Sequence, residues 1–135
     1  MPDITLAKTA AQLDSIGTTN SVVTELTSIA PNVETNLCQL TVPGGVWVFT
    51  SYWRFGRGNE NFQASLGIST ASGSSQAGSS GYTQFPITAE CNVPSVGTTR
   101  IFSFSGETTV YLVAWHNGAS DKSITTAELR AVRVA

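Results

Sequence analysis

Aromatic, amide and charged side chains that could hold a sugar lie at turns and strand ends along this chain. Sugars are bound by the faces of aromatic rings, by planar polar side chains and by hydrogen bonds from loops. Trp53 and Trp115 lie within strand-like runs, where core packing or a subunit interface is the simpler explanation, and the turn residues fit a solvated loop equally well. The candidate ligand-binding residues are Trp53, Arg57, Asn59, Asn61, Tyr82, His116, Asn117 and Asp121, with Arg54 and Trp115 as further candidates.

No arrangement of residues indicates catalysis. Hydrolysis of a glycosidic bond requires two carboxylates that face one gap, but the nine acidic residues are scattered and most lie at turns. A Ser-His-Asp site would have to use His116, the only histidine, which we interpret as an exposed residue at a strand end. The chain has no GxSxG motif, no glycine-rich phosphate loop and no calcium loop. We therefore expect a protein that is not an enzyme and that uses no metal or cofactor.

The composition favours a rigid, β-rich protein with a large part of its surface hidden in an oligomer. The chain has 135 residues, enough for one domain, and 41% of them are hydrophobic. Only 12% are charged, about half the usual share. The alternative explanation is a protein that works outside the cytosol. In either case charged residues are so few that Ser, Thr, Asn and Gln must supply most of the polar surface.

Charge and hydropathy argue against two classes of partner. The net charge is −2 and no basic run exists, so we expect no binding to nucleic acid or to an anionic membrane. No apolar run approaches the roughly 20 residues that span a bilayer, so membrane insertion is not expected either. The N-terminal stretch has an early Asp3 and no apolar block, which is not the pattern of a signal peptide. An extracellular role would require another route, such as release of a virion by lysis.

Cys38 and Cys91 each lie inside a strand-like run. One disulfide is arithmetically possible, but two reduced and buried thiols are favoured without a secretion signal. Neither cysteine has a CxxC pattern or a nearby histidine, so a zinc site is not indicated.

The segment from Val42 to Phe55 is the strand around which the rest of the chain is organised. A Pro-Gly-Gly turn opens it, and bulky residues then occupy both alternating sets of positions. A half-solvated strand would show one clearly polar set, so this strand should be covered on both faces. One face should fill the core, with Trp47 in it, and the other should approach a neighbouring subunit. Trp53 should reach an interface or a ligand.

The remaining pattern predicts an all-β jelly-roll sandwich of about eight strands, over residues 18–135. Residues 1–17 form a separate stalk or tail, in which 4–16 have the spacing of a short helix. A coiled-coil stub and a frayed tail explain that stretch equally well. Pro86 places its strand at an edge or a bulge. The uncharged Ser- and Gly-rich stretch from Ser69 to Gly81 should be a flexible loop.

Four segments resemble, in this order, parts of the C-terminal heads of phage tail fibres and tailspikes. They are VPGGVWVFTSYWRF with Trp47, SLGIS at Ser65–Ser69, VYLVA at Val110–Ala114, and the closing LRAVRV at Leu129–Val134. The family often has Thr where this chain has Val132. The resemblance covers roughly Leu37 to Ala135.

The resemblance implies a homotrimer of jelly rolls, similar to tumour-necrosis-factor-like heads, at the tail tip of a virion. Such a head trimerises the fibre, binds the host surface, or does both. Its partners would be a host surface polysaccharide or lipopolysaccharide and the remainder of the fibre. The alternative is a purely structural trimerisation or folding cap of a tail fibre or tail needle. The family supplies no shared ligand residues that transfer to this chain.

Overall fold

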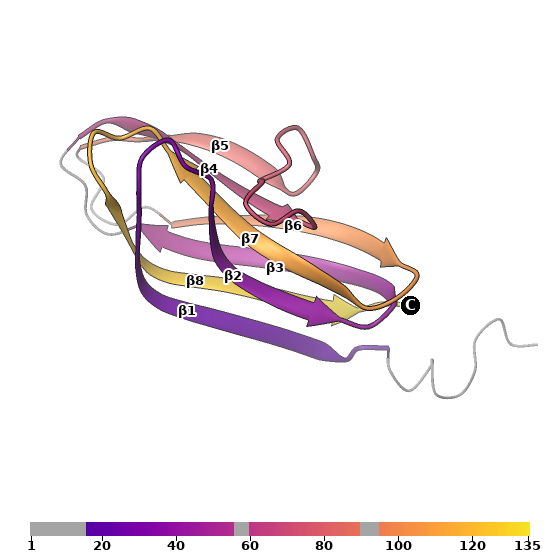
Figure 1. Cartoon of the computed structure of the whole chain (residues 1–135). Helices are drawn as coiled ribbons and strands as arrows, with labels where there is room; N and C mark the ends of the chain where they lie inside the picture. Colours follow the sequence, from indigo (N-terminus) through magenta and orange to yellow (C-terminus); the bar gives the residue numbers. More distant parts are fainter. Residues whose placement is uncertain (1–15, 56–59, 90–94) are drawn as a thin grey trace, which may run out of the picture.

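The chain folds into two four-stranded antiparallel sheets that pack face to face (Figure 1). The computed structural model describes residues 16–55, 60–89 and 95–135, without the side chains of residues 26, 55 and 95. Sheet A has the order β1-β8-β3-β6 and sheet B the order β2-β7-β4-β5. The strands of sheet A are β1 (Thr19–Ile29), β8 (Lys122–Arg133), β3 (Gly45–Phe55) and β6 (Ser95–Phe104). Those of sheet B are β2 (Thr35–Val42), β7 (Thr108–His116), β4 (Phe62–Ser69) and β5 (Tyr82–Ile87).

The strand order confirms the predicted all-β jelly roll of eight strands. The chain changes sheet at every connection except the one from β4 to β5, and this alternation is the pattern of a double-sheet jelly roll. Residues 1–15, and with them most of the predicted stalk, lie outside the described residues. No helix in the described ranges is long and apolar enough to cross a membrane.

The alternation of β3 separates a buried set of residues from a more exposed set. Trp47, Phe49 and Trp53 point inward and are fully or almost fully buried. On the outward face Val48 is half-buried, whereas Tyr52 is exposed. The single chain thus covers only the inward face along the whole strand, and cover of the outward face by a neighbouring subunit stays a prediction.

The aromatic residues of the core join the two sheets and correct one site prediction. Phe49 meets Phe102 of the neighbouring strand edge-to-face, with ring centroids 5.7 Å apart. Trp53 meets Phe85 of sheet B in the same way, at 5.8 Å. Trp53 is only 1% exposed. It is thus a core residue, as its position in the inward set of β3 requires, and it cannot contact a ligand at the surface.

The loop between β4 and β5 has a defined conformation, which corrects its prediction as a flexible segment. It folds back over the outward face of β4 (Figure 1), where a Cβ on Gly67 would collide with the carbonyl oxygen of Ser75. The Glu34 carboxylate accepts hydrogen bonds from the backbone N–H of Ser75, at 3.0 Å, and from its hydroxyl. Arg100 donates to the Gln76 side-chain oxygen at 2.6 Å and to the Ile68 carbonyl at 2.9 Å. The small residues of the loop permit this close approach.

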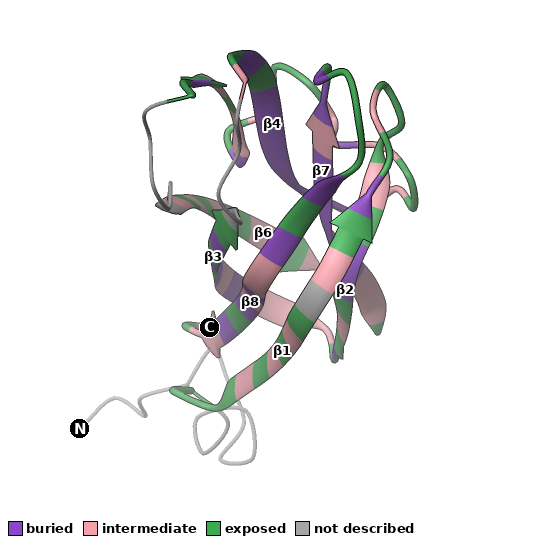
Figure 2. Ribbon diagram, turned by 90° about the vertical axis from the view of Figure 1, so that its left-hand side faces the viewer, coloured by how far each residue is buried: buried purple, intermediate pink, exposed green. Residues whose placement is uncertain are grey.

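The cover explains why β4 is buried along almost its whole length (Figure 2). In β1, by contrast, exposed and half-buried residues alternate along most of the strand. Two other predictions are confirmed in sheet B. The strand that contains Pro86 is at the sheet edge, where a missing N–H donor is tolerated. Cys38 is a buried free thiol, whereas Cys91 lies outside the described residues.

Candidate functional site

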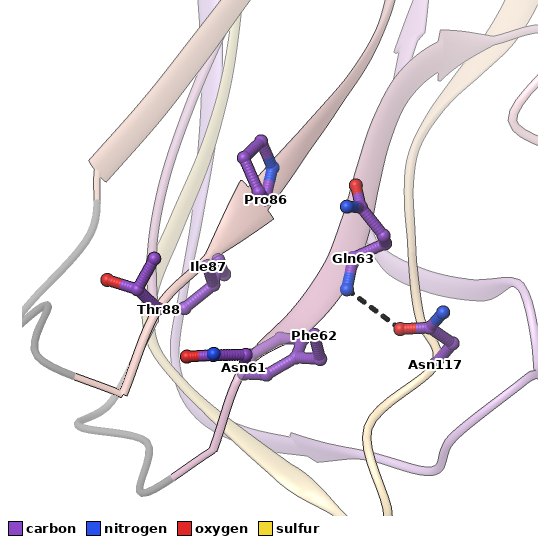
Figure 3. A pocket seen from close by; sticks show the side chains of 7 residues that line it. All are labelled: Asn61, Phe62, Gln63, Pro86, Ile87, Thr88 and Asn117. Carbon is purple, nitrogen blue, oxygen red and sulfur yellow. Dashed lines mark hydrogen bonds between the residues drawn. The ribbon is translucent and has the colours of Figure 1, made fainter.

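Two neighbouring pockets lie along β4, β5 and the end of β7. The larger, of about 450 Å³, is called the amide pocket here. It is lined by Asn61, Phe62, Gln63, Pro86, Ile87, Thr88 and Asn117 (Figure 3). The smaller, of about 210 Å³, is called the aromatic pocket. It is lined by Glu34, Ser65, Ser75, Ala77, Tyr82, Gln84 and Trp115.

Strand pairing brings two of the predicted residues, Asn61 and Asn117, into the amide pocket. Asn61 precedes β4 and Asn117 follows β7, and these strands pair with Ala64 opposite His116. The side-chain oxygen of Asn117 accepts a hydrogen bond from the backbone N–H of Gln63 at 2.7 Å (Figure 3). That of Asn61 accepts one from the backbone N–H of Ala89 at 2.8 Å. The hydrogen bond to its oxygen therefore fixes the orientation of each asparagine side chain.

The lining of the amide pocket leaves several polar groups for a ligand. Within residues 16–55, 60–89 and 95–135, the amide nitrogens of Asn61 and Asn117 make no hydrogen bond, and neither do the side chains of Gln63 and Thr88. The buried side chains of Phe62 and Ile87 supply an apolar floor. No charged residue lines the pocket. These groups suit a neutral ligand with hydroxyl groups and an apolar side.

His116 is a structural residue, and its prediction as an exposed residue and ligand contact is wrong. Its ring is completely buried. Nε2 lies 2.9 Å from the carbonyl oxygen of Ile29, and Nδ1 accepts a hydrogen bond from the N–H of Gly118 at 3.1 Å. Since Nδ1 accepts, we assign the neutral tautomer with the proton on Nε2. The carbonyl that buries the ring comes from the end of β1, which is distant in the sequence.

A hydrogen-bonded ion pair fixes the turn after β7 beside the amide pocket. The Lys122 ammonium contacts the Glu60 carboxylate, and its nitrogen lies 5.0 Å from the centre of the Phe62 ring. Glu60 also accepts a hydrogen bond from the N–H of Ala119 at 2.9 Å. The Lys122 hydrogen bond, followed by that of Ala119, lowers the pKa of Glu60 below its ordinary value. This contact positions the turn that carries Asn117.

The other predicted residues are divided among several places. Tyr82 and Trp115 lie half-buried in the aromatic pocket. Asp121 is exposed and lines neither pocket, and Arg54 is exposed on the outward side of sheet A. Arg57 and Asn59 lie outside the described residues. Among the residues that the structure describes, no group of three metal-ligating side chains occurs.

Sequence reasoning missed Gln63, Thr88, Gln84 and Glu34. The alternation of β4 held a signal for the first of these, because Gln63 is a large polar residue on the face opposite Phe62 and Ala64. The other three had no comparable signal, since their places depend on which strands pair and on where the β4–β5 loop lies.

Comparison with known proteins supports the fold alone. No protein-family model matches the chain, and no curated protein matches it. Among solved structures it is similar to a chain in the structure of infectious bursal disease virus, Gx strain, with a TM-score of 0.54 and 11% sequence identity. The similarity covers 98% of this chain but only 38% of that chain. At this identity the shared property is the β fold.

Proposed function

We propose that this chain is the head domain of a bacteriophage tail fibre or tailspike, which forms a homotrimer and binds a host surface polysaccharide or lipopolysaccharide during adsorption. The observation that carries the proposal is the amide pocket, where amide and hydroxyl groups surround an apolar floor without any charged residue. The ordered resemblance of four segments to tail-fibre heads supplies the phage setting and the location at the tail tip.

Glycan is the ligand class that this chemistry favours. A pyranose presents hydroxyl groups around its rim and C–H groups on its faces. The amide nitrogens of Asn61 and Asn117 are donors of fixed direction, because their oxygens are already bound to the backbone. Gln63 and Thr88 can donate or accept. Phe62, Ile87 and Pro86 offer the apolar surface for the ring face.

The trimer accounts for the outward face of sheet A near the chain terminus. Val48 pairs with Ile101 on one side and with Val132 on the other, so three aliphatic side chains form a row across the sheet. Ile101 is 63% exposed and Val134 is 45% exposed. Cover by neighbouring copies would gain about 25 cal/mol for each Å² of apolar surface buried. We place the subunit contact on this face.

Adsorption of the purified full chain to host cells tests the proposal. Gln63→Ala removes an exposed amide whose side chain has no bond to the rest of the described chain. Loss of a typical hydrogen bond costs about 1 kcal/mol, or roughly fivefold in affinity. Gln39→Ala is the matched control, since Gln39 is also exposed on sheet B but lines neither pocket. If the unmodified head does not adsorb to host cells, the proposal is refuted.

The second candidate is a structural cap that trimerises the fibre and binds no receptor. The apolar row on sheet A favours it as much as it favours an adhesin, because both need the trimer. Deletion of the domain would then cause misassembly of the fibre. Gln63→Ala would leave adsorption of intact virions unchanged, which separates the two candidates.

A further inference from the structure

The aromatic pocket gathers four side chains with unused hydrogen-bonding atoms. Within the described parts of the chain, no partner binds the hydroxyl of Tyr82, the amide of Gln84 or the indole N–H of Trp115. Both hydrogen bonds of Glu34 use Oε1, which leaves Oε2 unbound in the same ranges. Tyr82 and Trp115 are half-buried, so each presents part of its ring to the pocket. Glu34 and Gln84 are exposed, so their unused atoms are accessible to a ligand.

The fold holds the carboxylate of this pocket in a fixed position. Glu34 belongs to the β1–β2 connection and is bound to Ser75 of the β4–β5 loop through the N–H and the hydroxyl. The loop is in turn seated against Gly67, where any side chain would collide with Ser75. Glu34 therefore has little freedom to turn away from a ligand, and a preorganised group loses less entropy on binding.

The aromatic pocket continues the amide pocket along the same strands. Ser65 lies opposite Gln84 on one side and Trp115 on the other, whereas Gln63 lies opposite Pro86. Two residues along a strand span about 7 Å. One oligosaccharide lying along β4 would therefore reach both pockets.

We propose that the aromatic pocket is a second sugar subsite, which takes one neutral or amine-bearing pyranose unit and rejects an acidic one. This inference rests on the proposed glycan-binding function. A volume of about 210 Å³ is below the roughly 300 Å³ of sites for drug-sized ligands, so it suits a single sugar unit. Trp115 and Tyr82 stack on the ring, and Gln84 and Glu34 bind its hydroxyl groups. The Glu34 charge attracts an amine and repels a carboxylate, and no cationic side chain lines the pocket to offset it.

The indole N–H signals of the ¹⁵N-labelled full chain provide the test. Trp47 and Trp53 are buried, and the Trp47 N–H donates to the Pro43 carbonyl at 2.9 Å. Trp115 is the one half-buried member of the three, and its signal is identified by its loss in Trp115→Phe. Glucose, galactose, mannose, glucosamine and glucuronic acid are titrated separately. At least one neutral sugar and glucosamine should shift the Trp115 signal without shifting that of Trp47. Glucuronic acid should bind about tenfold more weakly than glucosamine.

Two variants assign the effect to the named residues. Trp115→Ala should weaken binding of the neutral sugar about tenfold, as judged from backbone amide shifts in β5. Glu34→Gln keeps an oxygen that accepts both Ser75 hydrogen bonds but removes the charge. It should bring glucuronic acid and glucose to within about twofold of each other. Glu107→Gln, at the exposed β6–β7 turn, is the matched charge control and should leave the preference unchanged.

The possible failures are distinguishable. If no sugar shifts the Trp115 signal, or if glucuronic acid binds the unmodified chain as tightly as glucosamine, the subsite is refuted. If the Trp115→Ala and Glu34→Gln heads adsorb to host cells as the unmodified head does, the subsite is also refuted, but the glycan-binding function stands. If the unmodified head does not adsorb at all, the proposed function itself fails, whatever the monosaccharides do.

Discussion

The outward faces of the two sheets differ in whether another segment of the chain covers them. Sheet A presents a regular strand surface, in which exposed Tyr52 alternates with buried residues of β3 and exposed Ile101 with half-buried residues of β6. On sheet B the corresponding outward residues Ser65 and Val113 are buried, with 2% and no exposure, beneath or beside the β4–β5 loop. The two faces thus come from the same alternation, but one of them is covered by the chain itself.

This difference shows how a jelly roll can combine a contact surface with a site. The aliphatic row of Val48, Ile101 and Val132 is not crossed by a loop, so it suits association over an area. Where a loop crosses a sheet face, the loop forms one side of a pocket. Contacts from distant segments then fix the polar groups, as the hydrogen bond between Glu34 and Ser75 does. The amide pocket and the aromatic pocket lie along the covered sheet, where β4 meets β5 and β7, whereas a pocket of about 410 Å³ at Val46 and Ser103 lies at one end of sheet A.

Thiol labelling tests the cover most directly and should give the largest effect. In a Cys91→Ser background, Ser65→Cys and Ser103→Cys place one thiol at an outward position of each sheet. The exposed position 103 should react freely, whereas position 65 should react only after the loop opens, slower by on the order of 100-fold. Equal rates would refute the cover.

Cys38 supplies the internal reference for this labelling experiment. Burial, with a smaller contribution from the charge of Glu128, raises the pKa of Cys38 to about 11. About 0.1% of that thiol is ionised near pH 8, against about a quarter of an ordinary cysteine. Cys38 should therefore stay unlabelled while Ser103→Cys reacts, as mass spectrometry of the peptides would reveal.

Gly67→Ala should displace the β4–β5 loop and make sheet B more like sheet A. The added methyl group would collide with the Ser75 carbonyl, and overpacking of this kind costs about 1–3 kcal/mol of stability. Urea unfolding measures the loss, and faster labelling of Ser65→Cys reports the exposed face. Gly106→Ala is the control, because a methyl group there meets no atom within 4 Å. Equal stability of the two variants would contradict the close packing of the loop.

Ile101→Asp should weaken the proposed trimer while leaving the fold intact. Burial of an isoleucine side chain contributes about 1.5–3 kcal/mol, and Ile101 has most of its surface left to bury. Sedimentation equilibrium should detect dissociation at concentrations where the unmodified chain is trimeric. Thr99→Asp, on the same face of β6, carries the same charge away from the aliphatic row and controls for it. If the unmodified chain sediments as a monomer, the proposed trimer is refuted.

The strands were predictable because their signals are local. The bulky alternation of Val42 to Phe55 gave the core position of Trp47, and Pro86 gave the edge strand. The site was only partly predictable. Asn61 and Asn117 are typical turn residues, but their meeting in one pocket depends on the pairing of β4 with β7.

Two of the wrong predictions share one physical cause, namely that contacts distant in the sequence decided them. The ring of His116 is buried against the carbonyl of Ile29, which lies 87 residues earlier. The Ser- and Gly-rich loop is fixed by Glu34, Asn36 and Arg100, none of which belongs to it. Low complexity indicated only that the loop had few bulky groups, and small residues can either move freely or pack closely.

The smallest expected effect concerns two ion pairs made by the two ends of β8, that of Lys122 with Glu60 beside the amide pocket and that of Arg130 with Glu128 on the outward face. The Lys122 hydrogen bond lowers the pKa of Glu60 from its ordinary 4.5, so the pair stabilises the fold above that pH and the stabilisation disappears as the pH falls below about 4.5. Lys122→Met keeps the contact with Phe62 but should return the pKa of Glu60 toward 4.5 and flatten this part of the stability profile. NMR titration of the Glu60 carboxyl measures the shift.

Arg130→Met is the matched change near the other end of β8, on the outward face of sheet A. Its partner Glu128 lies 3.2 Å away, but the Arg130 side chain is 55% exposed, against 10% for Lys122. Solvent screens an exposed pair more strongly, so its removal should leave the acid stability profile almost unchanged. If Arg130→Met changed that profile as much as Lys122→Met, the contact beside the amide pocket would be no more ordered than an ordinary surface pair. In that case the Lys122–Glu60 contact would not hold the turn that carries Asn117 in place, as the proposed site requires.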